Sequence, residues 1–460
     1  MKRFAADTGW VLSLSLLAGA AAILAVAAIA PLVPAVQVHA PWISHEVDYA
    51  AGLVGALIIG SFLLASPVCD RDSRALCLVW LIKAGVALGP MLYYEAHYAF
   101  LDAFTYHEDA RRQQYLLQDA GWGRGTENLT LFLQGLYLVL PESYHLAKVI
   151  FAFIGLIGIY LAYRGAQAAW GGGSVGPLYV MGLFPGLLFW SSILGKEAPM
   201  ILAAGLVVYG AGNFRRAHHR LRGVYTVLLG LVLAATLRIW MMYLLVAAFL
   251  VFVLLERSIG RASRFAAAGL VLALAFLFRE PAADLLALDR GDVVAHLGSL
   301  SSAWAEGGSA QEPPAFGRYA DVIAFVPVGG FTALFRPLPG EIASIFGLFA
   351  GIESLALFGI ACVALFRLDR RVVRDALFVA LVLLVAMWAV VYGVVSYQNL
   401  GTAARFRAQI LPVLLLASMF PWWRSPLRAR LFRVVPLDKA TLRARRRDAS
   451  GSSAGRGEKV

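Results

Sequence analysis

Residues 223–256 read GVYTVLLGLVLAATLRIWMMYLLVAAFLVFVLLE, a run of 34 positions in which Arg238 is the sole charge before the final glutamate. Both flanks are basic, with FRRAHHRLR (214–222) before the run and RSIGRASR (257–264) after it. Basic loops of membrane proteins stay on the cytoplasmic side, so both ends of the run belong there. The run therefore predicts a hairpin of two short membrane helices, with its tip near LRIWMM and Arg238 at or just below the outer surface.

The composition of the whole chain agrees with this interpretation. Of its 460 residues, 60% are hydrophobic and 15% are charged, against about 25% charged residues in soluble domains. The chain carries a formal net charge of +12, but excess Lys and Arg are expected in the cytoplasmic loops of membrane proteins. We therefore expect an all-α polytopic membrane protein, with membrane lipids and not nucleic acid around it.

Twelve apolar segments approach the length of about 20 residues that a membrane-spanning helix needs. They are residues 10–34, 50–66, 75–97, 146–164, 177–194, 198–213, 223–237, 239–256, 264–280, 342–366, 373–395 and 407–422.

With a cytoplasmic N-terminus, these twelve spans place four basic clusters on the cytoplasmic side, as the positive-inside rule requires. They are residues 214–222, 257–264, RLDRRVVR (367–374) and the tail from Arg424. The predicted organisation is a transmembrane domain over 1–423, with extracytoplasmic loops at 98–145 and 281–341. A basic, Gly/Ser-rich tail over 424–460 follows it, and we expect this tail to be disordered and cytoplasmic. The predicted location is the cell inner (plasma) membrane, with both termini in the cytoplasm.

The loop after the third span begins with DAFTYHED (102–109) and is not polar throughout. It ends in LTLFLQGLYLVL (129–140), which is apolar but too short to cross a bilayer. Segments of this kind lie in the membrane interface, so we expect interfacial helices around a cavity with Asp102, Glu108 and Asp109 at its edge.

A carboxylate at that edge could serve as a general base, since a partly desolvated carboxylate within reach of a hydroxyl removes its proton well. The alternative is an acidic helix start that faces water. Asp102 follows the span most closely and is favoured as the catalytic residue; for Glu108 and Asp109 both interpretations stay open.

Cations on the same side come from distant parts of the sequence. In FPGLLFWSSILGKEAPMILAAG (184–205), two predicted spans meet at Lys196 and Glu197 with almost no loop. Lysine binds phosphate as a point charge, so Lys196 could hold a phosphate that Glu197 orients. The alternative is a neutralising pair at a tight turn.

Further arginines lie at the predicted outer entrance of the last span, in NLGTAARFRAQILP (399–412). Arg405 and Arg407 are two residues apart and do not share one helix face, so at most one of them faces the cavity. Their alternative role is to anchor the helix in the interface.

The segment FRPLPGEIASIFGLFAGIESL (335–355) adds Arg336 and an intramembrane Glu353, and ionisable groups at such depth usually have a function. The preceding YADVIAFVPVGGFTALF (319–335) is interrupted by Pro327 and two glycines, and we expect a re-entrant segment packed into protein.

The chain resembles integral membrane glycosyltransferases of the GT-C superfamily. The resemblance lies in the acidic outer loop, in FPGLLFWSSILGKE and in NLGTAARFRAQILP. They are most similar to bacterial members known only as predicted glycosyltransferases or polysaccharide-synthesis proteins. The resemblance covers about residues 95–420 and implies sugar transfer from a polyprenyl-phosphate or polyprenyl-diphosphate carrier to an extracytoplasmic glycan or lipid acceptor.

By position, the resemblance implies that Asp102 is the base or, as in some branches, a ligand of a divalent cation such as Mg²⁺ or Mn²⁺. Glu108 or Asp109 is the alternative, because HED (107–109) is the nearest match to the paired carboxylates of protein mannosyltransferases. The carrier phosphate would be held by Lys196, Arg238, Arg405 and Arg407, and the expected substrate-binding set also includes His107, Glu197 and Arg336.

Two other functions compete with sugar transfer. A polysaccharide polymerase or ligase of the O-antigen type would use the same carrier with arginines and no essential carboxylate. A transporter or lipid flippase would place ionisable groups near the membrane midplane in two related halves, and this sequence shows no such repeat.

Overall fold

The computed structural model describes most of the chain between residues 30 and 423. The described residues are 30–40, 45–66, 70–98, 101–172, 174–280, 283, 294, 296–299, 305 and 308–423. Most of the first predicted span, much of the loop 281–341 and the tail 424–460 therefore lie outside them.

Almost all regular structure in the described residues is helical, and these residues contain no β-strand. The first half of the bundle contains α2 (Leu32–His39), α3 (His45–Ala65), α4 (Asp70–Leu88), α5 (Pro90–His97), α6 (Asp102–Arg111), α7 (Gly125–Tyr137), α8 (Tyr144–Trp170), α9 (Gly176–Gly182), α10 (Pro185–Trp190) and α11 (Glu197–Phe214). The second half contains α12 (Arg220–Leu237), α13 (Ile239–Leu255), α14 (Arg261–Leu277), α17 (Tyr319–Phe335), α18 (Ile345–Leu365), α19 (Ala376–Ser396), α20 (Leu400–Arg407) and α21 (Leu411–Trp423).

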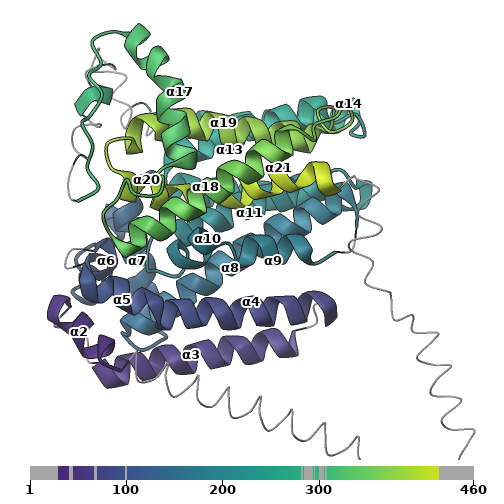
Figure 1. Cartoon of the computed structure of the whole chain (residues 1–460). Helices are drawn as coiled ribbons and strands as arrows, with labels where there is room; N and C mark the ends of the chain where they lie inside the picture. Colours follow the sequence, from purple (N-terminus) through teal and green to yellow (C-terminus); the bar gives the residue numbers. More distant parts are fainter. Residues whose placement is uncertain are drawn as a thin grey trace, which may run out of the picture.

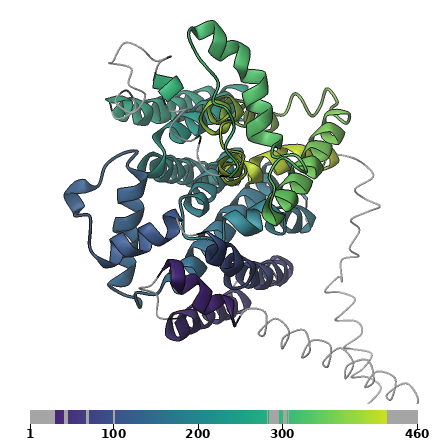
Figure 2. The ribbon, with the colours of Figure 1, turned by 60° about the vertical axis from the view of Figure 1, so that its left-hand side comes forward.

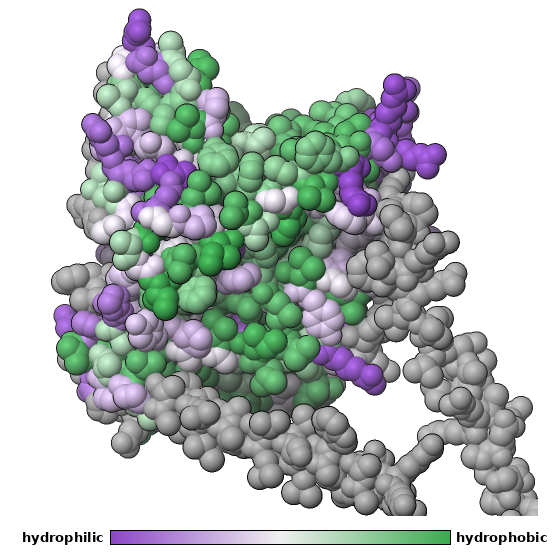
Figure 3. Space-filling model, in the orientation of Figure 1, coloured by the Kyte–Doolittle hydropathy of each residue, from purple (hydrophilic) through white to green (hydrophobic). Residues whose placement is uncertain are grey.

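Six stretches of helix among the described residues are long and apolar enough to cross a membrane, and a seventh would be the bent pair of α20 and α21. They indicate a multi-pass membrane protein. Large apolar side chains are exposed along α3, α14 and α18, and in Figure 3 a hydrophobic surface covers the middle of one face between more hydrophilic margins. Such a surface suits hydrocarbon better than water.

The centre of the bundle is α11, which is buried along almost its whole length. It packs against α8 through two glycine pairs, Gly158 with Gly205 and Gly165 with Gly212. A Cβ at Gly205 would overlap the carbonyl oxygen of Gly158, and a Cβ at Gly212 would overlap that of Gly165. The glycines on each helix are seven residues apart, about two turns, so the two backbones touch along one face, as small residues allow in membrane helices.

Most of the predicted spans coincide with helices. The two helices predicted in 223–256 are present as α12 and α13, which are separated only by Arg238. The prediction of one continuous span over 177–194 was wrong, because α9 ends at Gly182 and α10 begins at Pro185. Proline lacks an N–H and restricts the residue before it, which explains the break.

Residues 319–335, where a re-entrant segment was expected, form α17, a single helix with Pro327 inside it. Figure 1 shows α17 steeply inclined to the neighbouring long helices, at the end of the bundle where α20 lies.

The interfacial helices predicted in the loop 98–145 correspond to α6 and α7. In Figures 1 and 2 this segment lies at one end of the bundle, beside the ends of the long helices. The helices α2, α5 and α20 lie at the same end (Figure 1). The predicted acidic loop and the entrance of the last predicted span therefore lie at the same end of the bundle.

The contact between α8 and α11 predicts a specific sensitivity to side-chain size. We expect Gly205→Leu to destabilise the fold by about 1–3 kcal/mol, because overpacking a tight contact forces the backbones apart. The matched control is Gly269→Leu in α14, where a Cβ would meet no atom within 4 Å. The measurement is the free energy of unfolding of each variant in mixed micelles. Equal stability of the two would contradict the close backbone contact.

Candidate functional site

Arg405 in α20 joins two carboxylates from distant parts of the chain. Its Nη1 donates to Asp102 Oδ2 at 2.9 Å, across a separation of 303 residues. Its Nε donates to Glu197 Oε1 at 3.0 Å. The Glu197 side chain is fully buried, whereas that of Asp102 is 57% exposed. The cluster is therefore closed at Glu197 and open at Asp102.

Arg238 approaches the same buried carboxylate from the break between α12 and α13. Its Nη2 lies 3.9 Å from Glu197 Oε1, and its Nη1 donates to the hydroxyl of Tyr392 at 3.1 Å. The guanidinium carbon is 4.3 Å from the centroid of the Phe406 ring, a cation–π contact. These partners satisfy a cation that is almost fully buried.

Lys196 adds a third cation beside this pair. Its Nζ donates to Thr126 Oγ1 of α7 at 2.8 Å and lies 5.6 Å from the centroid of the Tyr106 ring in α6. Burial, together with the neighbouring Arg238 charge, lowers the pKa of Lys196 to about 8. Lys196 is therefore mostly charged at pH 7 and titrates just above it.

The residues between α10 and α11 form no regular helix and lead to Lys196, the N-cap of α11, and to Glu197, its first residue. Beneath this junction, the fully buried Lys83 of α4 donates to Ser192 Oγ at 3.1 Å and also to Ser191 Oγ. The lysine thus ties the unwound residues to α4. At Gly195, a Cβ would come within 2.8 Å of Glu197 Oε2, so a larger residue would collide with the carboxylate.

The loop that contains α6 and α7 is fixed to the end of α12, next to Arg238. The N–H of Gly123 donates to the carbonyl of Ala235 at 2.8 Å, and Asn128 Nδ2 donates to the carbonyl of Thr236 at 2.7 Å. The last carbonyls of a helix have no partner within it, so the loop satisfies two of them. This contact brings α7, and with it Thr126, to the cluster.

The charges of the cluster do not balance. It contains Lys196, Arg238 and Arg405 against Asp102 and Glu197. With every group ionised, three positive and two negative charges leave a net charge of +1. An anion is therefore the ligand that this arrangement favours, and phosphate suits arginine in particular.

The other two acidic residues of the loop do not join the cluster. Glu108 pairs with Arg112, the residue that follows α6, and lies 3.7 Å from Arg111 at the end of the helix. Asp109 forms no ion pair with any described residue. Its pKa is raised by burial and by the nearby Glu108 charge. Among the three candidate bases, Asp102 alone contacts the cations.

His107 also stays outside the cluster, although it was expected to bind substrate. Its Nδ1 lies 2.6 Å from the hydroxyl of Tyr137, and burial lowers its pKa to about 3. The ring is therefore neutral and packs α6 against α7. That contact gives His107 a structural role.

Arg407, expected to hold the carrier phosphate, and Arg336, expected in the wider substrate-binding set, both lie outside the cluster, and the Arg407 side chain is buried elsewhere. Arg407 Nη2 lies 3.5 Å from Glu353 Oε1, and its Nη1 donates to Ser354 Oγ at 2.9 Å and to the carbonyl of Arg336 at 3.2 Å. The side chain of Arg336 pairs with Glu341 at 2.6 Å. Because Arg405 and Arg407 are two apart, they point to different sites, as the sequence predicted.

Several residues that complete the cluster were missed in the sequence. Tyr106 follows Asp102 by four positions on α6, so helical spacing could have identified it. Thr126, Tyr392 and Phe406 carry no local signal, because only the packing of distant helices brings them to the cations.

The described residues do not suit a protein-held metal ion. They contain no group of three or more His, Cys, Asp and Glu side chains that could hold one. At the cluster, Glu197 is buried and bound by two arginines, which leaves Asp102 as the accessible carboxylate. No step of the proposed reaction is therefore assigned to a divalent cation.

Comparison of the chain with protein-family models, with curated proteins and with solved structures found no match.

The buried position of Glu197 makes its partner essential for stability. We expect Arg405→Ala to lower the free energy of unfolding by about 3 kcal/mol, because it removes the closest counter-charge of a buried carboxylate. The double variant Arg405→Ala/Glu197→Gln should regain part of this loss. Arg318→Ala, which removes an exposed pair with Asp321, is the control and should cost less than about 1 kcal/mol. Equal losses in the Arg405 and Arg318 variants would contradict the contact.

Proposed function

We propose that the chain is a membrane glycosyltransferase of the GT-C type. It would move a sugar from a polyprenyl-phosphate-linked donor to an extracytoplasmic glycan or lipid acceptor. The observation that carries the proposal is the cluster in which Lys196, Arg238 and Arg405 surround Glu197 and meet one exposed carboxylate, Asp102. A cationic site beside a possible base has the two groups that this transfer needs.

A lipid-linked donor fits the position of the cluster at the end of apolar helices. Its isoprenoid tail can stay in hydrocarbon while its sugar and phosphate reach the helix ends. The phosphate gains negative charge as it leaves, and fixed cations stabilise that charge where it develops. Arg405 can present two parallel N–H groups to phosphate oxygens, as it now does to carboxylates.

The present contact between Arg405 and Asp102 suggests how binding and catalysis are linked. A carboxylate and a phosphate compete for the same guanidinium N–H groups. Donor phosphate that binds Arg405 would therefore release Asp102, which is exposed and free to turn toward an acceptor. In this scheme the base becomes available only when the donor is in place.

In the proposed reaction, the acceptor hydroxyl oxygen attacks C1 of the donor sugar. The bond between C1 and the phosphate oxygen breaks, and its electron pair leaves with the carrier phosphate. Asp102 takes the hydroxyl proton. Arg405, Arg238 and Lys196 hold the phosphate, and Glu197 keeps the two arginines in place.

The membrane arrangement is part of the same proposal. We infer twelve spans, in which α9 with α10 forms one broken span and α11, α13 and α14 are short spans. The cluster would then lie on the extracytoplasmic side of the plasma membrane, with both termini in the cytoplasm. The basic segments 214–222, 257–264 and 367–374 support this orientation.

A polysaccharide polymerase or ligase is the second candidate. The observation that favours it is that Arg405 already engages both carboxylates, so the accessible chemistry is dominated by arginine. Such an enzyme would use the same carrier and would not require Asp102.

Asp102→Asn separates the two candidates. We expect this variant to lose about 100-fold or more of the transfer rate, because an amide cannot accept the hydroxyl proton. The measurement is the initial rate of transfer from a polyprenyl-phosphate-linked hexose or pentose, labelled in the sugar, by purified protein in liposomes.

The matched control for that experiment is Glu108→Gln, which changes another carboxylate of α6, one that pairs with the neighbouring Arg111 and Arg112 and not with the cluster. It should keep near-normal activity. Full activity of Asp102→Asn would rule out the carboxylate-base mechanism and support the polymerase or ligase. Absence of transfer in the unmodified protein with every donor and acceptor would contradict both candidates.

The pKa of Lys196 near 8 predicts a pH dependence of phosphate binding. Between pH 7 and pH 9.5, affinity for polyprenyl monophosphate should fall by about tenfold as Lys196 loses its proton and one charge-assisted hydrogen bond. Arginine side chains do not lose their proton over this range. Lys196→Arg should make the affinity independent of pH over this range. The same pH dependence in both proteins would show that another group titrates.

A further inference from the structure

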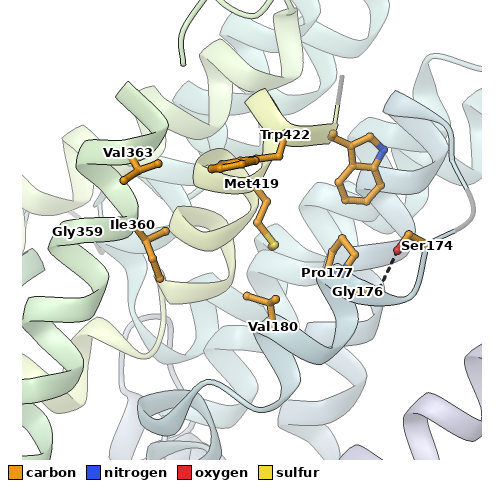
Figure 4. Close-up of a pocket in the computed structure, with 10 residues that line it drawn as sticks. Ser174, Gly176, Pro177, Val180, Gly359, Ile360, Val363, Met419 and Trp422 are labelled. Atoms are coloured by element: carbon orange, nitrogen blue, oxygen red, sulfur yellow. Dashed lines mark hydrogen bonds between the residues drawn. The ribbon is translucent and has the colours of Figure 1, made fainter. Parts of the chain in front are cut away.

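A second feature of the molecule lies at the opposite end of the bundle from the ionic cluster. A cavity of about 520 Å³ opens between α9, α18 and α21 (Figure 4). Sites for small ligands typically span about 300–1,000 Å³. Its lining is almost entirely apolar and consists of Ser174, Gly176, Pro177, Val180, Gly359, Ile360, Val363, Met419, Trp422 and Trp423.

Two polar groups of this lining, the Ser174 hydroxyl and the Trp423 indole N–H, already have partners. Ser174 Oγ accepts a hydrogen bond from the N–H of Gly176 at 3.1 Å, and Trp423 Nε1 donates to the carbonyl of Gly171 at 2.7 Å. In Figure 4 the side chains of Val180, Ile360 and Met419 point into the space between the helices. The cavity therefore offers hydrophobic contact and little else, which suits a hydrocarbon chain.

The cavity faces sideways, toward the surface that hydrocarbon would cover. On α18, Ile360 is 38% exposed and Val363 is 45% exposed, while Trp422 on α21 is 39% exposed. The span α18 has few buried residues along its length. Because α18 is one of the helices long and apolar enough to cross a membrane, lipid chains are the molecules that meet this opening.

A cation lies beside the opening. Arg367 follows the end of α18, and its guanidinium carbon is 3.7 Å from the centroid of the Trp422 ring. Its side chain is exposed, and it forms no ion pair with any residue that the structure describes. Arginine and tryptophan both favour the headgroup region, and an unpaired arginine there attracts an anionic headgroup.

We propose that the groove between α9, α18 and α21 binds one acyl chain of an anionic phospholipid, whose headgroup phosphate contacts Arg367. The preference for a phospholipid over the polyprenyl carrier rests on the proposed function, which gives the carrier's phosphate its cations at the other end of the bundle. The groove and Arg367 themselves do not depend on sugar transfer.

The experiment uses the full-length protein in detergent and measures lipid binding by native mass spectrometry. Phosphatidylglycerol, phosphatidylcholine and polyprenyl monophosphate are titrated separately. Gly359→Phe is the blocking variant, because a Cβ at Gly359 meets no atom within 4 Å and a larger side chain would project into the groove. Gly269→Phe in α14, where a Cβ also has open space, is the matched control.

We expect Gly359→Phe to weaken phosphatidylglycerol binding by about tenfold or more, since methylene groups kept out of the groove lose their hydrophobic burial. Gly269→Phe should bind it normally. Arg367→Gln, a surface change, should abolish the preference for phosphatidylglycerol over phosphatidylcholine.

Three results would overturn the proposal. The first is equal binding of phosphatidylglycerol by the Gly359 and Gly269 variants. The second is an unchanged headgroup preference in Arg367→Gln, which also tests the site should Gly359→Phe fail to fold. The third is a loss of polyprenyl monophosphate binding, and not of phosphatidylglycerol binding, in Gly359→Phe.

Discussion

Arg405 holds Asp102 and Glu197 at the same time, and this double contact fixes the relation between three parts of the chain. Asp102 begins α6, Glu197 begins α11, and Arg405 lies in α20, which is bent by 64° from α21. Arg238 reaches the same carboxylate from the break between α12 and α13. A buried carboxylate is tolerated only with such partners, so the breaks in these helices and the cluster depend on each other.

The breaks in the helices place backbone polar groups and charged side chains beside the cluster. A continuous apolar helix satisfies its own backbone and presents few polar groups. At each break near the cluster, backbone carbonyls without a partner in their own helix accept hydrogen bonds from other residues. Lys83 donates to the carbonyl of Leu187 below the α10–α11 junction, and Gly123 and Asn128 donate to carbonyls at the end of α12. The glycine contacts between α8 and α11 hold the central helix rigidly under this irregular end. Rigid support of this kind gives a charged site a fixed geometry.

The sequence predicts the positions of the helices well, because apolar runs and basic loops act locally. The same patterns predict that four residues lie at one end of the bundle, because each stands at the predicted end of a span. These residues are Asp102, Lys196, Arg238 and Arg405. The sequence could not decide between Arg405 and Arg407, whose partners depend on how α20 packs. The pairing of Glu108 with Arg111 and Arg112 was readable from its i, i+3 and i, i+4 spacing. The contribution of Tyr392 to the cluster was not, because it arises only from tertiary packing.

We propose that the cations around Glu197 hold a lipid phosphate and that this phosphate displaces Asp102 from Arg405. A cryo-electron microscopy structure of the protein in lipid nanodiscs with added polyprenyl monophosphate tests this. We expect phosphate density within hydrogen-bonding distance of Arg405, with Asp102 turned away from the guanidinium. Lipid phosphate density elsewhere, with the contact between Arg405 and Asp102 unchanged, would contradict it.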